Sequence, residues 1–149
     1  MTIWVDADSC PKQVRDIVGR AAEKRQVRTI FVANRAFHTP RSVQMVEVPG
    51  SPEAADEHII RGAEAGDMAI TRDIPLAASL VERGVIVLND RGAVYSRENV
   101  RERLSIRDFM KGLRDSGVYE RPGRSYSNSE VHAFAAAFDR ELTRCLDLK

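Results

Sequence analysis

The chain has 149 residues, of which 43% are hydrophobic and 30% are charged. This composition is typical of one globular domain and argues against a disordered chain. No apolar run approaches the roughly 20 residues of a membrane-spanning helix, so we expect no membrane partner. The net charge is +1, which gives no overall attraction to nucleic acid. Binding to RNA or DNA would therefore need a local basic patch.

The two cysteines, Cys10 and Cys145, indicate no disulfide framework and fit a reducing compartment. The first predicted strand begins at about residue 2, which leaves no room for a cleavable signal peptide. We therefore expect a cytoplasmic protein.

Five apolar runs alternate with helical patterns through residue 90, which is typical of βαβ units around a parallel sheet. Runs such as Thr29-Ile30-Phe31-Val32 are continuous, as strands that are buried on both faces require. The pattern therefore predicts an α/β fold in three layers. The predicted strands cover about residues 2–6, 28–33, 43–48, 67–71 and 85–88.

Three helices are predicted between these strands, over about residues 11–25, 51–66 and 75–84. Pro11 suits the first turn of the first helix. In the second helix, Ile59, Ile60 and Ala63 form an apolar stripe that should face the sheet. Gly84 is a suitable residue to end the third helix.

After residue 96 the pattern is helical only, which predicts extra C-terminal helices over residues 97–149 packed on the sheet. Ser105 and Asp108 have capping-box spacing, so we expect a break between two helices there. A loop over residues 117–127 should follow, and Ser127 with Glu130 forms a second capping box. The apolar stripe of the last helix should cover the sheet, although a dimer contact is the alternative. Both a monomer and a homodimer therefore remain open.

Carboxylates follow two of the predicted strands. Asp6 and Asp8 end the run Ile3-Trp4-Val5, and Asp73 ends the run Ala69-Ile70-Thr71-Arg72. Ligands bind at the carboxyl ends of parallel strands, and carboxylates gathered there repel one another unless protons or a cation neutralise them. Oxygen ligands favour Mg²⁺ or Mn²⁺. The pattern predicts a divalent-metal site for phosphate chemistry.

Structural roles compete with this interpretation. Asp8 or Ser9 can cap the helix that begins near Pro11, and Asp73 can cap the next helix. Pro75 disfavours helical geometry at Ile74, which would move that cap to Ile74. Asp6 is poorly placed as a cap, and a carboxylate at the end of a buried strand needs a partner.

The predicted second helix supplies another acid. Asp56 lines up with the inward stripe and can reach the site, whereas Glu57 is paired with Arg61 at i+4 on the solvent side. The alternative for Asp56 is complementation of the helix dipole. Asp67 precedes a strand and is predicted to be a turn residue at the wrong end of the sheet. Asp90 lies in a strong turn pattern and is predicted to be structural, although it follows a strand on the correct side.

Three segments of the chain together closely resemble the uncharacterised bacterial YaiI/YqxD family, and the resemblance runs over nearly the whole chain. The segments are IWVDADSCP, AADEHIIRGAEAGDMAITRDIPLA and RERLSIRDFMKGLRDSG. That family is grouped with the PIN-like superfamily, whose members are largely metal-dependent nucleases. The resemblance implies a single PIN-like domain over residues 1–149, with a parallel sheet of order 3-2-1-4-5 and helices on both faces.

The resemblance also implies roles for individual residues. Asp6, Asp56 and Asp73 match the first three acids of the PIN-like site and would be catalytic. Thr71 matches the small hydroxyl residue that commonly stands two positions before the third acid. Asp8 is typical of the YaiI/YqxD family and not of PIN domains in general. Asp90 is the nearest candidate for the fourth acid.

The resulting hypothesis is a Mg²⁺ or Mn²⁺ site formed by Asp6, Asp8, Asp56 and Asp73. One ion, or two at roughly 3.5–4 Å, would activate a water and stabilise an in-line attack on a phosphodiester. The three histidines, His38, His58 and His132, share no metal-ligand spacing, which argues against zinc.

A nuclease also needs groups that bind its substrate. Asn34, Arg35, Arg72 and Arg91 lie near the expected edge of the site and are candidates. Arg107, Lys111 and Arg114 share one face of a predicted helix and could form the local basic patch. The alternative is an ordinary solvated face.

Two other functions compete with a nuclease. The pattern of apolar residues before Asp6-Ala7-Asp8 also resembles the haloacid-dehalogenase phosphatases, in which the first Asp is a nucleophile; Gly66-Asp67 with Asp73 resembles their last acidic motif. The chain could also be a non-catalytic module that binds nucleic acid or a protein. A nucleophilic Cys10 is not expected, because no histidine pairs with it and nearby acids raise a thiol's pKa.

Overall fold

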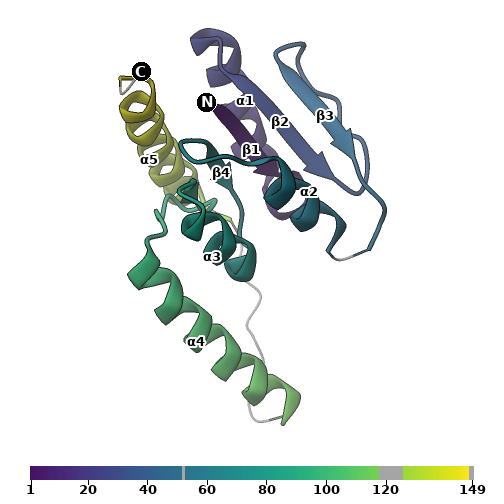
Figure 1. The fold of residues 1–149 in the computed structure, drawn as a ribbon, viewed down its shortest axis with the longest axis vertical. Coiled ribbons are helices and arrows are strands. Elements are labelled where there is room, and N and C mark those ends of the chain that lie inside the picture. Colours follow the sequence, from purple (N-terminus) through teal and green to yellow (C-terminus); the bar gives the residue numbers. More distant parts are fainter. Residues whose placement is uncertain (52, 118–125, 148–149) are drawn as a thin grey trace.

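A computed structural model describes residues 1–51, 53–117 and 126–147. Its centre is a five-stranded parallel sheet of order β3-β2-β1-β4-β5, which confirms the predicted α/β fold (Figure 1). Each strand lies within two residues of its predicted bounds. The strands are β1 (Thr2–Asp6), β2 (Arg28–Ala33), β3 (Val43–Glu47), β4 (Met68–Ile70) and β5 (Ile86–Leu88).

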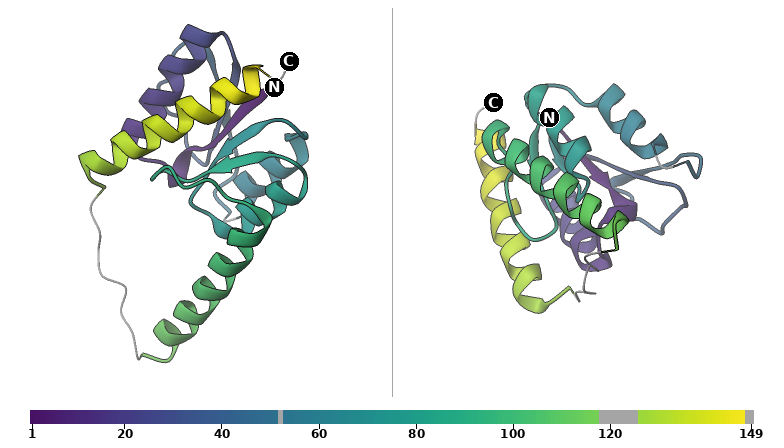
Figure 2. Two further views of the ribbon diagram at one scale, coloured as in Figure 1. Left: turned by 90° about the vertical axis from the view of Figure 1, so that its left-hand side faces the viewer. Right: turned by 90° about the horizontal axis from the view of Figure 1, so that it is seen from below.

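Helices cover both faces of the sheet and complete three layers (Figures 1 and 2). The helix α1 and the C-terminal helix α5 pack on one face, and α2 and α3 pack on the other. The elements are a short 3-10 turn η1 (Ala7–Ser9), α1 (Lys12–Arg25), α2 (Ala54–Gly62), α3 (Ile74–Glu82), α4 (Arg97–Asp115) and α5 (Asn128–Asp147).

The central strand β1 connects the two halves of the core. Successive side chains of a strand point to opposite faces, and all five residues of β1 are buried. Ile3 and Val5 pack toward α1 and α5, whereas Trp4 packs toward α2. The middle of such a strand is apolar, and β1 therefore carries its terminal residue, the buried Asp6, to the carboxyl end of the sheet.

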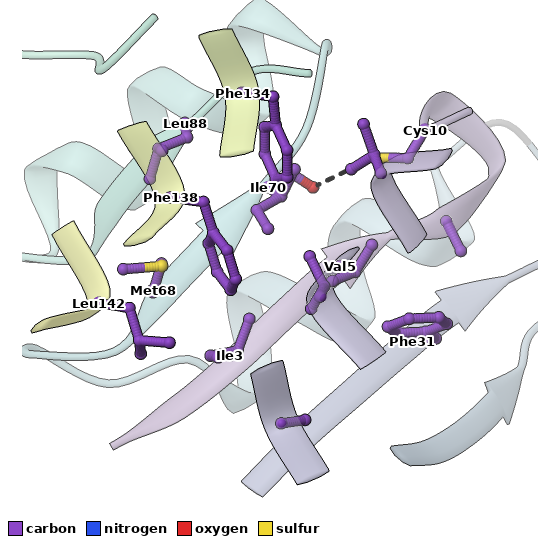
Figure 3. Packing of buried hydrophobic residues seen from close by; sticks show 14 of the residues in the cluster. Ile3, Val5, Cys10, Phe31, Met68, Ile70, Leu88, Phe134, Phe138 and Leu142 are labelled. Carbon is purple, nitrogen blue, oxygen red and sulfur yellow. Dashed lines mark hydrogen bonds between the residues drawn. The ribbon is translucent and has the colours of Figure 1, made fainter. Parts of the chain in front are cut away.

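The last helix, α5, covers the sheet as predicted from its apolar stripe. Phe134, Phe138 and Leu142 are fully buried among residues of β1, β4 and β5 (Figure 3). The predicted capping box is also present, because Ser127 Oγ accepts the Glu130 N–H and the Glu130 carboxylate accepts the Ser127 N–H, both at 3.3 Å. The preceding loop, predicted over 117–127, falls largely outside the described residues.

Helix α2 is shorter than predicted, and two contacts lie at its C-terminal end. A Cβ on Gly62 would lie 2.4 Å from Cη2 of the Trp4 ring, so this position has room only for glycine. The next residues then turn so that the Glu64 N–H reaches the Asp67 carboxylate at 2.9 Å. Ala63 accordingly has an extended backbone.

The predicted helix break at Ser105 is wrong, because α4 continues through it from Arg97 to Asp115. The Ser105 hydroxyl donates to the Arg101 carbonyl four residues earlier, a bond that a helix accommodates. The capping box lies instead at the start of α4, between Ser96 and Asn99. The beginning of α4 packs on α3, and its remainder projects from the body of the protein (Figures 1 and 2).

None of the helices that the structure describes is both long enough and apolar enough to cross a lipid bilayer. Cys10 and Cys145 are both buried and unpaired in any disulfide.

Candidate functional site

A hollow of about 370 Å³ opens at the edge of the sheet where β1, β2 and β4 end. Four separate segments of the chain bring carboxylates to it: the end of β1, the turn η1, the first turn of α2 and the residues after β4. This edge is where parallel strands present a ligand site. The structure thus brings together six of the residues singled out in the sequence: Asp6, Asp8, Asn34, Asp56, Arg72 and Asp73.

Asp6 is the most buried of these acids, at 6% exposure. Its Oδ2 accepts a hydrogen bond of 2.8 Å from the Thr71 hydroxyl, which in turn accepts the Asp73 N–H at 3.0 Å. Burial raises the pKa of Asp6, hydrogen bonds from Thr71 and Ser9 oppose that rise, and the charges of Asp73 and Asp8 add to it. Thr71 therefore fixes both the orientation of Asp6 and the backbone that carries Asp73.

Asp73 is the N-cap of α3, with its Oδ1 accepting the Leu76 N–H at 2.9 Å. The expected cap at Ile74 is wrong: Ile74 and Pro75 occupy the first helical turn, where the missing N–H of proline costs no hydrogen bond. A cap uses one carboxylate oxygen. Asp73 Oδ2 has no hydrogen-bond partner within the described chain, so the residue can cap the helix and still face the hollow.

Asp8 does not cap α1, whose N-cap position is Pro11. The exposed carboxylate instead accepts the Asn34 N–H at 2.7 Å, which ties the turn after β1 to the end of β2. Asn34 lines the hollow through this contact, and its role as a substrate ligand stays a prediction.

Asp56 reaches the hollow from the third position of α2, on the same side as the buried Ile59. Its side chain is half-buried. Burial together with the charges of Asp73 and Asp6 raises the pKa of Asp56 to about 6. The structure thus brings Asp56, Asp73 and Asp6 within electrostatic reach of one another, although they lie on three different elements.

Arg72 lines the same hollow, but its guanidinium pairs with an acid outside the cluster. Arg72 Nε lies 2.7 Å from Oδ2 of Asp90, whose side chain is fully buried. Arg91 also pairs with Asp90, at 3.5 Å, and with Glu130 of α5, at 3.4 Å. Asp90 therefore keeps Arg72 from neutralising the four carboxylates, and it does not itself line the hollow.

Two predicted substrate residues lie elsewhere. Arg35 stacks over the Phe37 ring at 4.9 Å, and Arg91 is held in the ion pairs with Asp90 and Glu130. Neither residue lines the hollow.

Asp67 lies at the opposite edge of the sheet, as expected. Its carboxylate accepts the Thr2 N–H at 2.9 Å, the Trp4 Nε1–H at 3.2 Å and the Glu64 N–H. Asp67 is therefore a structural acid that anchors the start of β1. It cannot act with Asp73 as a phosphatase motif would require.

Cys10 lies inside the core beside Ile70, with its Sγ 4.0 Å from the Ile70 carbonyl oxygen (Figure 3). Burial raises the pKa of the Cys10 thiol far above its ordinary value, and the charges of Asp6 and Asp90 raise it further. A thiol held protonated in this way is not a nucleophile.

The donors that line the hollow fit a hard divalent cation, because they are carboxylate oxygens and include no histidine or cysteine. In the part of the chain that the structure describes, no three His, Cys, Asp or Glu side chains are arranged to hold a metal ion. Burial first, and the charges of the neighbouring carboxylates second, raise the pKa values of Asp6 and Asp56, so a cation in the hollow would favour their ionised forms.

Sequence reasoning missed the pairing of Arg72 with Asp90. The register of the parallel strands contains the signal. Ile70 of β4 pairs with Leu88 of β5, so Arg72 and Asp90, two positions beyond each strand end, also lie side by side. A cation after one strand and an anion after its neighbour are then expected to meet. The contribution of Ser9 was also missed: its hydroxyl donates to the Asp6 carbonyl and accepts the Arg72 N–H.

Known proteins resemble the chain over almost its whole length. The model of the family described as "Uncharacterized BCR, YaiI/YqxD family" matches residues 4–144. A UPF0178 protein of Myxococcus xanthus is 53% identical over 146 residues, covering 97% of this chain and 95% of the relative. One from Syntrophobacter fumaroxidans is 44% identical, covering 100% and 99%, and one from Treponema pallidum is 45% identical, covering 99% and 85%. No solved structure matches the chain. The chain therefore belongs to the uncharacterised bacterial YaiI/YqxD family.

Proposed function

We propose that the protein is a divalent-metal-dependent phosphodiesterase of PIN-like type that cleaves RNA or DNA. The observation that carries the proposal is the convergence of four carboxylates from four segments on one hollow at the carboxyl edge of the sheet. The adjacent cation, Arg72, is engaged by Asp90, so the negative charge of the cluster is left for another cation to neutralise.

Asp6, Asp56 and Asp73, with Asp8 at the rim, would hold Mg²⁺ or Mn²⁺. When bound, such an ion lowers the pKa of a coordinated water and stabilises the charge that develops on a phosphate. The protein must therefore present deprotonated carboxylates. Thr71 holds Asp6 in place through the 2.8 Å hydrogen bond, and the N-cap contact fixes Asp73 on the rigid start of α3.

Among the described residues, Arg72 is the group best placed to contact a substrate phosphate. Its side chain is 45% exposed, lines the hollow and is oriented by the fully buried Asp90. A guanidinium held in this way offers its remaining N–H groups to phosphate oxygens. Asp90 would thus position Arg72 without touching the substrate.

Calorimetry with Mn²⁺ tests the site directly. Asp56→Asn and Asp6→Asn should each weaken Mn²⁺ binding by about tenfold or more, because each removes a charged ligand. Glu57→Gln is the matched control, since Glu57 lies on the exposed side of the same helical turn and should bind Mn²⁺ as the wild type does. Equal Mn²⁺ affinity in Asp56→Asn, Asp6→Asn and wild type would overturn the metal site.

Activity is measured in the same variants with RNA and DNA oligonucleotides in Mg²⁺ or Mn²⁺. The proposal expects cleavage by the wild type and by Glu57→Gln, and loss of cleavage in Asp6→Asn and Asp56→Asn and in a further variant, Asp73→Asn. Cleavage that persists in EDTA would contradict a metal-dependent mechanism.

A second function has one observation in its favour. Asp8 and Asp73 each use a carboxylate oxygen to accept a backbone N–H, as structural residues do. The protein would then be a non-catalytic module that binds nucleic acid or a protein. Thermal unfolding separates the two functions, because a metal bound only by the folded state raises the melting temperature. A melting temperature unaffected by millimolar Mg²⁺ and Mn²⁺ would favour the binding module.

A further inference from the structure

A second hollow, of about 540 Å³, adjoins the carboxylate site on the side of α4. Arg72 and Asp73 line both hollows, so the two are continuous at the start of α3. The far wall is the face of α4 that carries Arg103, Arg107 and Arg114. We call this second hollow the α4 groove.

The α4 groove is cationic where the first hollow is acidic. Its charged lining residues are four arginines and one carboxylate, Asp73. Residues 103, 107 and 114 are spaced by four and seven positions, which places them on one face of a helix. The chain therefore places a row of positive charge directly beside the acids.

None of the three α4 arginines of the groove, Arg103, Arg107 and Arg114, is paired with a buried acid among the residues that the structure describes. Arg107 pairs with its exposed neighbour Asp108 at 3.2 Å, a contact of little energetic consequence. The Arg103 guanidinium lies over the Tyr95 ring, with its Cζ 5.1 Å from the ring centre, and hydrogen-bonds the Tyr95 side chain; Tyr95 carries no charge to neutralise it, and Arg103 also lines the groove. Within the described residues, the Arg114 side chain has no ion-pair or hydrogen-bond partner.

Apolar side chains also line the groove, two of them from α4 among the arginines and one from the start of α3. Ile74, Ile106 and Met110 line the α4 groove, and Ile106 is 55% exposed. Cations that track a phosphate backbone, combined with exposed apolar surface for the bases, are the features of a surface for single strands. A duplex would present its phosphates but keep its base faces stacked away from these side chains.

We propose that the α4 groove binds a single strand of nucleic acid and leads it to the carboxylate site. The identity of the ligand as a substrate rests on the proposed function, whereas the binding surface does not. Arg103 and Arg114 are eleven residues apart, or about 16 Å along the helix, which is the axial length of about five stacked nucleotides. The groove would thus contact a few phosphates of the strand in addition to the phosphate at the carboxylate site.

Fluorescence anisotropy with labelled 12-nucleotide RNA, DNA and duplex probes tests the groove in EDTA, where binding is read without cleavage. Arg107→Gln combined with Arg114→Gln should weaken single-strand binding about tenfold at moderate salt, and lower the salt slope by about 1.4, for two phosphate contacts at 0.7 each. Arg101→Gln is the matched control, because Arg101 is exposed on the opposite side of α4. This control should bind as the wild type does.

The proposal would be refuted if the wild type did not bind single strands, or if it bound the duplex more tightly than either single strand. Equal affinities of the double variant and of Arg101→Gln for single strands would also refute it. A change of oligomeric mass in the double variant, measured by light scattering, would assign the face to a contact between copies instead. RNA and DNA affinities then show which sugar the groove prefers.

Mn²⁺ calorimetry separates this proposal from the proposed function. The double variant should bind Mn²⁺ as the wild type does, because neither arginine lines the first hollow. If strand binding depended on the arginines but the protein did not bind Mn²⁺, the groove proposal would be supported and the phosphodiesterase proposal would be refuted. If the double variant still bound Mn²⁺, cleaved its substrate and bound single strands as tightly as the wild type does, the proposed function would stand and the groove proposal would fall.

Discussion

Removing the charge of Asp56 should stabilise the metal-free protein at neutral pH. Burial, Asp73 and Asp6 raise the pKa of this acid from 3.8 to about 6. A group whose pKa is higher in the folded state binds more protons when folded, so its contribution to stability falls as the pH rises from about 4 to about 6. Above this window the ionised Asp56 opposes folding.

The size of the effect follows from the shift. At 1.36 kcal/mol per pKa unit, a rise from 3.8 to about 6 corresponds to about 3 kcal/mol. Asp56 is only half-buried, so solvent screening reduces this to about 1.5 kcal/mol. The dipole of α2 favours an acid in its first turn by about 0.5 kcal/mol and opposes the gain. The net stabilisation expected for Asp56→Asn is therefore about 1 kcal/mol.

Urea unfolding in EDTA, followed by the fluorescence of the single tryptophan, Trp4, measures this effect. At about pH 7.5, Asp56→Asn should have a free energy of unfolding about 1 kcal/mol above wild type, and the difference should shrink at about pH 4.5. Glu57→Gln should stay within about 0.5 kcal/mol of wild type at both values. A less stable Asp56→Asn at neutral pH, or a difference that does not change with pH, would refute the electrostatic argument.

Three further substitutions, with one control, test buried contacts of the site and of the sheet. Thr71→Val should lower the free energy of unfolding by about 1–3 kcal/mol in urea, because Asp6 Oδ2 and the Asp73 N–H lose the same hydroxyl; a change below about 0.5 kcal/mol would contradict the buried pair. Asp67→Ala should cost about 3 kcal/mol, since three donors lose their acceptor, and should shift the emission of Trp4; unchanged emission would count against the Nε1 contact. Gly62→Ala should cost about 1–3 kcal/mol through its clash with Trp4, whereas Gly112→Ala in the open part of α4 should stabilise by about 0.5–1 kcal/mol; equal effects would contradict the close packing of Gly62.

The sheet could be predicted from the sequence because burial on both faces leaves a strong pattern. Continuous apolar runs located all five strands, and the resemblance supplied their order. The same reasoning brought Asp6 and Asp73 to one edge, since the carboxyl ends of β1 and β4 are adjacent in that order. Asp56 followed from helical periodicity, which placed it on the inward side of α2.

Contacts between side chains distant in sequence could not be predicted in this way. Arg72 and Arg91 share the buried Asp90, and this depends on the alignment of two strand ends and on the docking of α5. The helix break predicted at Ser105 was wrong because capping-box spacing is only a local signal. The helix continues through Ser105, whose hydroxyl donates to the carbonyl four residues earlier. The α4 groove was missed in part because Arg103 and Met110 join the basic face only once α4 is one unbroken helix beside α3.

The position of α5 has a consequence for how the chain acquires its native state. Phe134, Phe138 and Leu142 complete the face of the sheet that β1 begins, although more than 120 residues of chain separate the two segments. On the ribosome, the apolar face of β1, β4 and β5 must wait for the last helix to emerge, and during synthesis it is open to aggregation. Completion of this face of the sheet is thus tied to a late, sequence-distant docking step that contact order makes slow.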